Sequence, residues 1–372
     1  MTKSGSTISI RENVLLAPFT TLGIGGPARY FVAVKHEEQI PEAMEFAFKR
    51  GCPVFILGSG SNVVVSDSGF DGLIVKIEMT GIQSFDDEYM ISVAAGEEWD
   101  GLVRRCVGLN LAGLECLSGI PGTVGAAPIQ NIGAYGEEAS DVILSVRVFD
   151  RESQDIMELS ATECKFAYRS SIFNTTEAGR YIILKVSFGL RVDGTPRIQY
   201  RDLQLRFGER SRLPGLREVR DAVLQIRESK AMVLIENDPD SKSVGSFFKN
   251  PILNGAAAAQ VENRARACGL LGISEKIPSF QTPAGKEKLP AAWLIERAGF
   301  TKGFVRGNAA ISGKHALALI NSGGASAQDI LDLMQLIQGR VCELFGVELQ
   351  PEPVFVGFPV SGFQFPVKNS EQ

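Results

Sequence analysis

The sequence predicts an α+β protein, and three observations lead to this fold class. Short apolar runs separated by polar turns fill the first half of the chain, whereas amphipathic helical patterns dominate the last third. Between them, residues 192–217 are rich in arginine, glycine and proline, which is typical of a loop or hinge. The length of 372 residues allows two or three domains. We therefore predict a boundary within residues 192–225.

The first unit is predicted to be rich in β-strands, with one helix packed on it. Apolar residues recur at helical spacing from Ile40 to Phe48, so residues 37–50 form a helix that ends at Gly51 and Pro53. Strands are expected at residues 54–57, 63–65, 73–77 and 91–95.

The middle of the chain contains a long glycine-rich stretch, residues 119–136. A helix over about 98–107 precedes it, and strands at 142–148 and 181–190 follow. Ser160 and Glu163 have the spacing of a capping box, which predicts a short helix between these two strands.

Helices are predicted for most of the last third. Residues 219–226 and about 256–268 and 290–298 have helical patterns. The clearest helix covers about 326–345, and Gly346 follows it as a cap. Its apolar face consists of Ile330, Leu333, Met334, Ile337, Val341 and Leu344.

Composition excludes several classes of function. A net charge of −5 disfavours a general nucleic-acid binder, and no apolar run approaches the roughly 20 residues of a membrane span. The six cysteines contain no CxxC pair, so we expect free thiols in the cytoplasm and no metal site. His36 and His315 are the two histidines, and neither lies near an obvious nucleophile. We therefore expect any proton transfer to use other residues.

Two glycine-rich loops stand out, GSGSN at 58–62 and GIPGTVGAAP at 119–128. Glycine lets backbone N–H groups approach a phosphate closely, so two such loops suit a diphosphate held from two sides. Each loop taken alone is more often an ordinary tight turn. The first lacks the third glycine of the Rossmann fingerprint, and neither continues as Gly-Lys-Ser/Thr, so a dinucleotide would bind through another fold.

Six motifs together resemble the UDP-N-acetylenolpyruvoylglucosamine reductase family, in the family's order and over residues 18–357. They are TTLGIGGPARYF (20–31), ILGSGSNVVVSD (56–67), GIPGTVGAAPIQNIGAYG (119–136), FAYRSSIF (166–173), VGSFFKNP (244–251) and PEPVFVG (351–357). The resemblance implies a vanillyl-alcohol-oxidase (PCMH) type FAD-binding domain of two subdomains, followed by a C-terminal α/β substrate-binding domain.

The domain limits implied are an N-terminal tail at 1–17, the FAD-binding domain at 18–192, a hinge at 193–225 and the substrate-binding domain at 226–372. The two FAD-binding subdomains would cover about 18–80 and 81–192. This chain departs from the family's usual sequence in three loop segments. Thr20-Thr21-Leu22-Gly23 replaces the frequent Asn-Thr-Phe-Gly, Ser243-Val244 replaces Asn-Ala, and the segment from Lys230 to Gly245 is longer than in many members.

The activity implied is NADPH-dependent reduction of an enolpyruvyl ether on a UDP-sugar, through non-covalently bound FAD. Hydride would pass from flavin N5 to the methylene carbon, and Ser246 would donate the proton. Arg169 would face the developing enolate and the substrate carboxylate, and Glu352 would help hold an enolic form. Without the motifs, each of these three is more simply a turn, a surface ion pair or a solvated glutamate.

The resemblance also implies binding residues, and we expect a monomer whose partners are NADPH and the sugar nucleotide. The FAD contacts implied are Gly58, Ser59, Gly60, Ser61, Asn62, Gly119, Ile120, Pro121, Gly122, Thr123, Gly125, Ala126, Gly133 and Tyr135. The substrate contacts implied are Tyr168, Tyr200, Lys230, Lys249 and Asn250, with Tyr200 in a loop (198–203) similar to the one that folds over the substrate in the family's longer subclass.

Two alternatives remain at the level of sequence. One is another flavin oxidase or dehydrogenase of the same fold, which would often attach its flavin through a histidine that neither glycine loop contains. The other is a nucleotide-binding module without catalysis, which leaves the polar residues Arg169, Ser246 and Glu352 unexplained.

Overall fold

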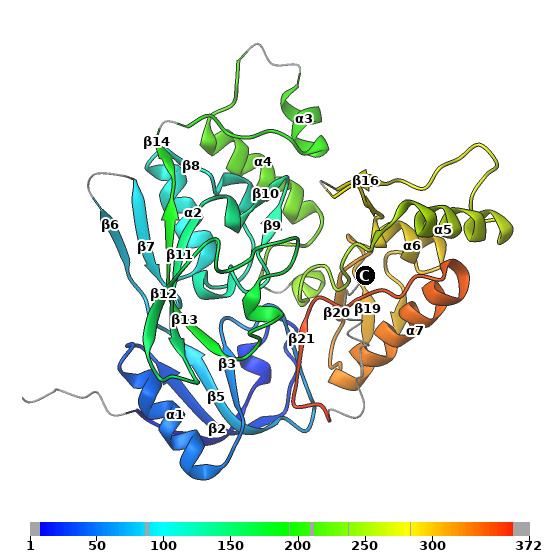
Figure 1. Ribbon diagram of the computed structural model, residues 1–372. Helices are drawn as coiled ribbons and strands as arrows, with labels where there is room; N and C mark the ends of the chain where they lie inside the picture. Colours follow the sequence, from blue (N-terminus) through cyan, green and yellow to red (C-terminus); the bar gives the residue numbers. More distant parts are fainter. Residues whose placement is uncertain are drawn as a thin grey trace, which may run out of the picture.

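The computed structural model describes residues 8–85, 89–192, 194–208, 212–236, 238–282 and 284–359. The ends of the expected N-terminal tail (1–7) and of the expected C-terminal domain (360–372) lie outside these residues. Figure 1 shows three parts, a small sheet with α1, a larger antiparallel sheet with α2 and α4, and a C-terminal part with α5, α6 and α7.

The small sheet has the strand order β1-β2-β5-β3. β1 pairs with β2 antiparallel, whereas β2, β5 and β3 pair parallel. Its apolar residues alternate between two cores, one of which lies beneath α1. Gly51 ends α1 with φ 59°, as the sequence predicts. The bounds are β1 Arg11–Leu15, β2 Pro27–Val34, α1 Gln39–Arg50, β3 Val54–Leu57, β4 Val63–Val65 and β5 Phe70–Ile77.

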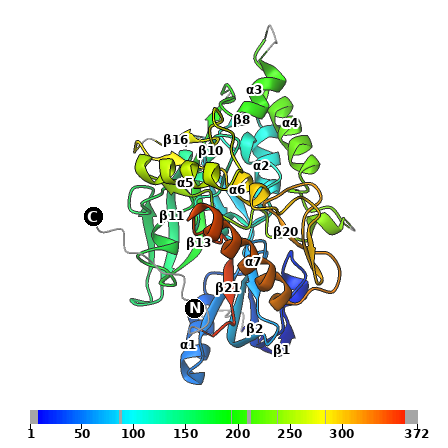
Figure 2. The ribbon, with the colours of Figure 1, turned by 90° about the vertical axis from the view of Figure 1, so that its right-hand side faces the viewer.

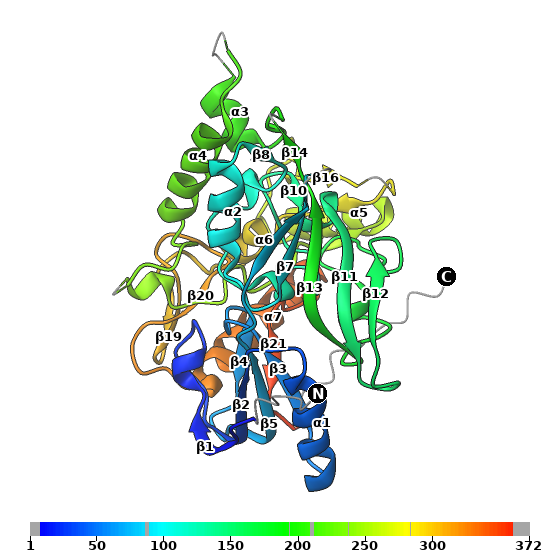
Figure 3. The same ribbon diagram turned by 90° about the vertical axis from the view of Figure 1, so that its left-hand side faces the viewer.

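The larger sheet is fully antiparallel, with the order β12-β11-β13-β7-β6, and its strands lie side by side in Figure 3. Trp99 of α2 is fully buried against it and contacts Phe188 of β13 edge to face. The bounds are β6 Ile82–Phe85, β7 Met90–Ala94, α2 Trp99–Gly108, β8 Leu111–Ala112, β9 Gly133–Ala134, β10 Glu137–Glu138, β11 Ile143–Asp150, β12 Ile156–Ser160, β13 Tyr181–Gly189, β14 Arg191–Val192, α3 Arg201–Phe207 and α4 Leu216–Ser229.

The C-terminal part packs three helices and short strands around a separate core, and these helices face the viewer in Figure 2. Ser326 caps α7 through a capping box with Asp329, and Gly346 ends it with φ 70°. The bounds are β15 Ile252–Leu253, α5 Gly255–Ala267, β16 Phe280–Gln281, β17 Glu287–Lys288, α6 Ala291–Arg297, β18 Val305–Arg306, β19 Ala309–Ile311, β20 Leu319–Asn321, α7 Ala327–Phe345 and β21 Val354–Val356.

A strand pairing and a helix cap are among the contacts that tie the C-terminal part to the small-sheet part. β21 pairs parallel with β4, and Figure 1 shows β21 returning between the parts. Asp67 accepts hydrogen bonds from Ala327 N at 2.8 Å and from Gln328 N at 3.2 Å, at the start of α7. A carboxylate at a helix N-terminus satisfies unpaired N–H groups and faces the positive end of the helix dipole.

The structure corrects the expectation of a loop across residues 192–217, because α3 lies within it. Leu203 and Phe207 are four residues apart and bury their side chains against Val219 and Val223 of α4. A helix of this length contributes too few apolar positions to be recognised from periodicity.

The short helix expected after Ser160 is also wrong. Ser160 N and Oγ donate to Glu163 Oε2 at 2.8 and 2.6 Å, so the capping contacts form. The chain then turns instead of continuing as a helix, and Lys165 adopts φ 47°. A left-handed residue interrupts the helical backbone at that point.

The segment expected to be an N-terminal tail (1–17) also differs from the expectation, because it contains the strand β1. Leu16, which follows the strand, is fully buried, and Val14 packs against the same core. Within the described part of the chain, no helix combines the length and the apolar character that crossing a membrane needs.

Candidate functional site

The two glycine loops lie against each other between the small and the larger sheet. Ser61 Oγ donates to Pro121 O at 3.0 Å, and Asn62 Nδ2 donates to Gln130 Oε1 at 2.9 Å. A Cβ on Gly58 would lie 2.9 Å from Thr123 Oγ1, so any larger residue there would displace the Thr123 hydroxyl group. The two loops are therefore in direct contact, and whether they hold a diphosphate between them stays a prediction.

The first loop also carries unused hydrogen-bond donors. Among the residues that the structure describes, no protein acceptor is found for the backbone N–H groups of Ser59, Gly60 and Ser61. Gly60 has φ 72°, and a Cβ there would lie 1.9 Å from Phe19 O. Adjacent free N–H groups in a turn with a left-handed residue form a concavity that suits an anion such as a diphosphate.

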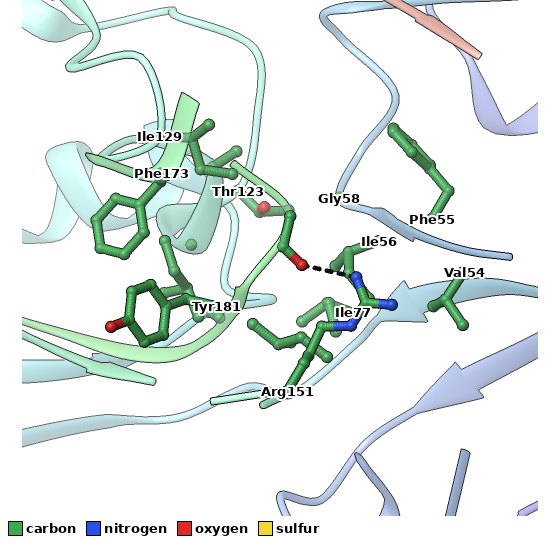
Figure 4. A pocket seen from close by; sticks show the side chains of 16 residues that line it. Val54, Phe55, Ile56, Gly58, Ile77, Thr123, Ile129, Arg151, Phe173 and Tyr181 are labelled. Carbon is green, nitrogen blue, oxygen red and sulfur yellow. Dashed lines mark hydrogen bonds between the residues drawn. The ribbon is translucent and has the colours of Figure 1, made fainter. Parts of the chain in front are cut away.

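An apolar cavity of about 180 Å³, partly open to solvent, adjoins these loops. Figure 4 shows Phe173, Tyr181 and Ile129 on one wall and Phe55 with Gly58 on the other. Arg151 reaches between these walls in Figure 4 and donates to Gly179 O at 2.7 Å. The lining residues are Val54, Phe55, Ile56, Gly58, Ile77, Ala95, Thr123, Gly125, Ala126, Ile129, Arg151, Phe173, Gly179, Tyr181, Ile182 and Ile183.

The sequence did not reveal most of this cavity. Gly58, Thr123, Gly125 and Ala126 were expected to contact the cofactor, but the lining residues of β3, β5 and β13 were not. Their apolar pattern is that of ordinary core strands, so nothing in it distinguished a cavity wall from a packed core.

A second, polar cluster lies where three segments meet. Arg169 Nε is 3.3 Å from Glu352 Oε1, and the two side chains are 19% and 14% exposed. Arg169 also donates from Nη2 to Gly133 O at 2.7 Å, and its φ of 51° is unusual for arginine. Burial raises the pKa of Glu352, although Arg169 and Lys249 oppose the rise.

Ser246 and Lys249 belong to the segment beside Glu352. Glu352 N donates to Phe247 O at 2.9 Å, and Lys249 N donates to Gln350 O at 2.9 Å. Burial lowers the pKa of Lys249, while Glu352 acts in the opposite direction. Backbone hydrogen bonds thus hold the segment of Ser246 beside Glu352, and Glu352 pairs with Arg169 through its side chain, although none of the three lines the apolar cavity.

The expected substrate residues fall into two groups. Tyr168 and Asn250 adjoin the polar cluster, with Lys288 Nζ 4.8 Å from the Tyr168 ring centre and Asn250 Oδ1 accepting from Ala291 N at 2.9 Å. Lys230 and Tyr200 lie near α3 instead.

In this second group, Lys230 Nζ is 3.0 Å from Asp202 Oδ2. Tyr200 packs edge to face on Tyr135 at 5.3 Å between ring centres, so the loop before α3 covers the end of the glycine-rich stretch.

The expectation that neither histidine lies near a nucleophile is wrong for His315. Its Nε2 is 3.4 Å from Ser246 Oγ. The two residues are 69 positions apart, and Phe247 N donates to Leu317 O at 2.8 Å to bring their segments together. Contacts between distant segments of this kind leave no signal in a single sequence.

Glu115 and Glu137 form a buried acidic pair at the two ends of the glycine-rich stretch. Glu115 Oε2 accepts from Gly113 N at 2.7 Å, and Glu137 Oε2 accepts from Cys116 N at 3.2 Å. The remaining oxygen of each carboxyl group has no hydrogen-bond partner among the described residues. Burial, followed by the neighbouring Glu115, raises the pKa of Glu137 to about 7.

Glu137→Gln should flatten the pH dependence of stability. The folded state keeps the Glu137 proton up to a pKa of about 7, whereas the unfolded chain releases it near 4.5. The folded state therefore binds more protons in this window, and the unfolding free energy falls as pH rises through it. Relative to the variant, the wild type should lose about 3 kcal/mol between pH 4 and pH 8.

Urea unfolding at several pH values measures this difference. Glu348→Gln, at an exposed glutamate, is the matched control and should keep the wild-type slope. A Glu137→Gln variant whose stability follows pH as the wild type does would rule out the buried proton.

No group of three or more potential His, Cys, Asp or Glu metal ligands occurs within the described ranges. The arrangement is instead an apolar cavity, a glycine loop with unpaired backbone N–H groups among the described residues, and a polar cluster with one cationic and one acidic side chain in contact.

A family model described as an FAD-binding domain matches residues 28–160. A second, described as the C-terminal domain of UDP-N-acetylenolpyruvoylglucosamine reductase, matches residues 235–356.

Relatives of similar length carry the same name. The UDP-N-acetylenolpyruvoylglucosamine reductase of Thermobifida fusca is 44% identical, over 94% of this chain and 99% of its own. That of Streptomyces coelicolor is 43% identical, over 92% and 89%. The crystal structure of the Thermus caldophilus enzyme is similar with a TM-score of 0.63 at 26% identity, covering 94% of this chain and 98% of that one.

Proposed function

The chain belongs to the UDP-N-acetylenolpyruvoylglucosamine reductase family, and from this membership we propose the reaction that its site performs. It is an FAD-dependent oxidoreductase of peptidoglycan precursor synthesis. The reaction proposed is reduction of UDP-N-acetylglucosamine enolpyruvate to UDP-N-acetylmuramate, with NADPH as the reductant.

The residues around the glycine loops fit a non-covalently bound FAD. The apolar walls of the cavity suit an aromatic ring system, and the free N–H groups of Ser59 to Ser61 suit its diphosphate. Bound there, FAD would supply the hydride chemistry, with NADPH as the source and the methylene carbon of the substrate as the acceptor. Every other step depends on side chains of this chain.

Ser246 donates the proton that completes the reduction. Hydride addition at the methylene carbon leaves negative charge on the adjacent carbon and its carboxylate, which is basic enough to take a proton from a hydroxyl group. The alkoxide left on Ser246 requires nearby positive charge, and Lys249, three residues along the same segment, is suited to supply it.

Arg169 and Glu352 hold the substrate carboxylate. The guanidinium group offers a planar pair of donors for a carboxylate, and it already contacts an acidic partner. The raised pKa of Glu352 is expected to rise further beside a second carboxylate, so Glu352 is able to share a proton with an enolic form.

Lys230 and Tyr200 near α3, together with Lys249, bind the uridine diphosphate, whereas Asn250 and Tyr168 contact the substrate at the polar cluster. Lys230 is engaged with Asp202 in this structure, so binding would exchange that partner for a phosphate. A cytoplasmic location and a monomeric state stay predictions.

The observation that carries the proposal is the Arg169–Glu352 ion pair, held by backbone hydrogen bonds to the segment of Ser246 and placed beside the two glycine loops. This combination provides an anion site, a carboxylate site and a proton donor in one region.

Anaerobic spectroscopy tests the proposal. The protein as purified should be yellow, NADPH should bleach it, and stoichiometric UDP-N-acetylglucosamine enolpyruvate should restore the colour. A protein that bleaches but is not recoloured by this substrate would keep the flavoprotein assignment and lose the substrate. A colourless protein that takes up no FAD would contradict the whole proposal.

A further inference from the structure

His315 is held beside Ser246 by the backbone of two neighbouring segments. Phe247 N donates to Leu317 O at 2.8 Å, and Ser243 forms an antiparallel bridge with Ile320. Ser246 and His315 therefore face each other at a fixed spacing, with Oγ 3.4 Å from Nε2. Both side chains are half-buried, so the contact is not a chance meeting of mobile surface groups.

The imidazole of His315 is neutral at neutral pH. Burial, followed by the positive charges of Lys230, Lys302 and Arg227, lowers its pKa to about 4. A neutral imidazole has one N–H donor and one bare nitrogen, so Nε2 either donates to Ser246 Oγ or accepts from it.

The two tautomers have opposite consequences for a proton donor. If Nε2 accepts, the hydroxyl hydrogen of Ser246 points at the imidazole and away from any substrate. If Nε2–H donates, that hydrogen is free, and the imidazole N–H stabilises negative charge on Oγ. Lys230, Lys302 and Arg227, whose positive charges act on His315, add a favourable potential for negative charge on the neighbouring Oγ.

We propose that His315 is a positioning residue, whose Nε2–H donates to Ser246 Oγ and directs the Ser246 hydroxyl proton toward the substrate. This rests on the proposed function. In the step concerned, the O–H bond of Ser246 breaks and a C–H bond forms at the carbon next to the substrate carboxylate. The electron pair of the O–H bond stays on Oγ, and water returns a proton to it afterwards.

His315→Phe removes the donor while keeping a ring of similar size. In stopped-flow experiments on the FAD-loaded enzyme, flavin reduction by NADPH should stay within about twofold of the wild type. Reoxidation by saturating UDP-N-acetylglucosamine enolpyruvate should slow about 10- to 100-fold, the usual effect of losing one hydrogen bond to a developing charge. His36→Phe, at an exposed histidine, is the matched control and should change neither rate.

Two further comparisons separate positioning from a structural or binding role. His315→Gln offers an amide N–H of comparable reach and should recover most of the reoxidation rate, whereas the shorter His315→Asn should not. In the Ser246→Ala background there is no hydroxyl to orient, so adding His315→Phe should cause no further slowing. The Gln and Asn pair also keeps the test valid if the Phe variant folds poorly.

Equal reoxidation rates in the wild type, His315→Phe and His315→Asn would overturn the inference. The inference would also fail if His315→Phe slowed reoxidation equally in the wild-type and the Ser246→Ala backgrounds. It would fail as well if the variant lost only affinity for the substrate. A wild-type enzyme that this substrate does not reoxidise would instead sink the proposed function, and the inference with it.

Discussion

Ser246→Ala should slow the recolouring of reduced enzyme by its substrate about 10²- to 10⁴-fold, while NADPH bleaches the variant at the wild-type rate. Flavin reduction by a nicotinamide needs no proton from Ser246, so only the second half-reaction depends on its hydroxyl group. The loss reflects the absent proton donor alone, because Phe247 N and Phe247 O keep the segment in place through backbone hydrogen bonds that alanine leaves intact.

Stopped-flow absorbance measures the two half-reactions separately. Ser322→Ala, an exposed serine in the same part of the molecule, is the control and should behave as the wild type. Equal slowing of both half-reactions by Ser246→Ala would indicate that the serine supports the flavin site and does not deliver the proton.

The sequence predicted the elements with complete local signals. For α7 the capping serine, the apolar face and the terminal glycine agree, and the observed bounds lie within one residue of those expected. α3 has only Leu203 and Phe207 as buried anchors, and its stability comes from α4. Its existence therefore depends on tertiary contacts that the local sequence does not encode.

The fold class expected from the motifs is confirmed by the FAD-binding and C-terminal family matches and by the Thermus caldophilus structure. The glycine loops could be argued from chemistry alone, since glycine and anion binding are linked by backbone geometry. The polar cluster could not be predicted from chemistry alone, because Arg169 and Glu352 are ordinary charged residues in the sequence. The resemblance supplied them, and the structure shows the ion pair between them.

The contact between His315 and Ser246 could be predicted neither from the motifs nor from local sequence patterns. An isolated histidine before an apolar run is most simply a core residue, and the backbone pairing that brings it to Ser246 appears only in three dimensions. The cavity wall was missed for a related reason, since apolar strand residues have the same pattern whether they face a core or a ligand.

Arg169→Ala and Glu352→Ala should each slow reoxidation at saturating substrate by about 10²- to 10³-fold, and the double variant should lose far less than the product of the two. The two side chains contact each other at 3.3 Å and are proposed to act on one carboxylate, so removing either already disables the unit. Glu352→Gln should retain more activity than Glu352→Ala, because an amide still offers a donor where a protonated carboxyl group would.

A double-mutant cycle on the reoxidation rate checks this, with flavin reduction as an internal reference. Arg340 and Glu343 provide a matched control, since their ion pair at 2.7 Å is exposed and far less restrained. Substitutions there should be additive and nearly silent. Additive losses at Arg169 and Glu352 would mean that the two residues contribute through separate contacts, and the shared carboxylate site would have to be abandoned.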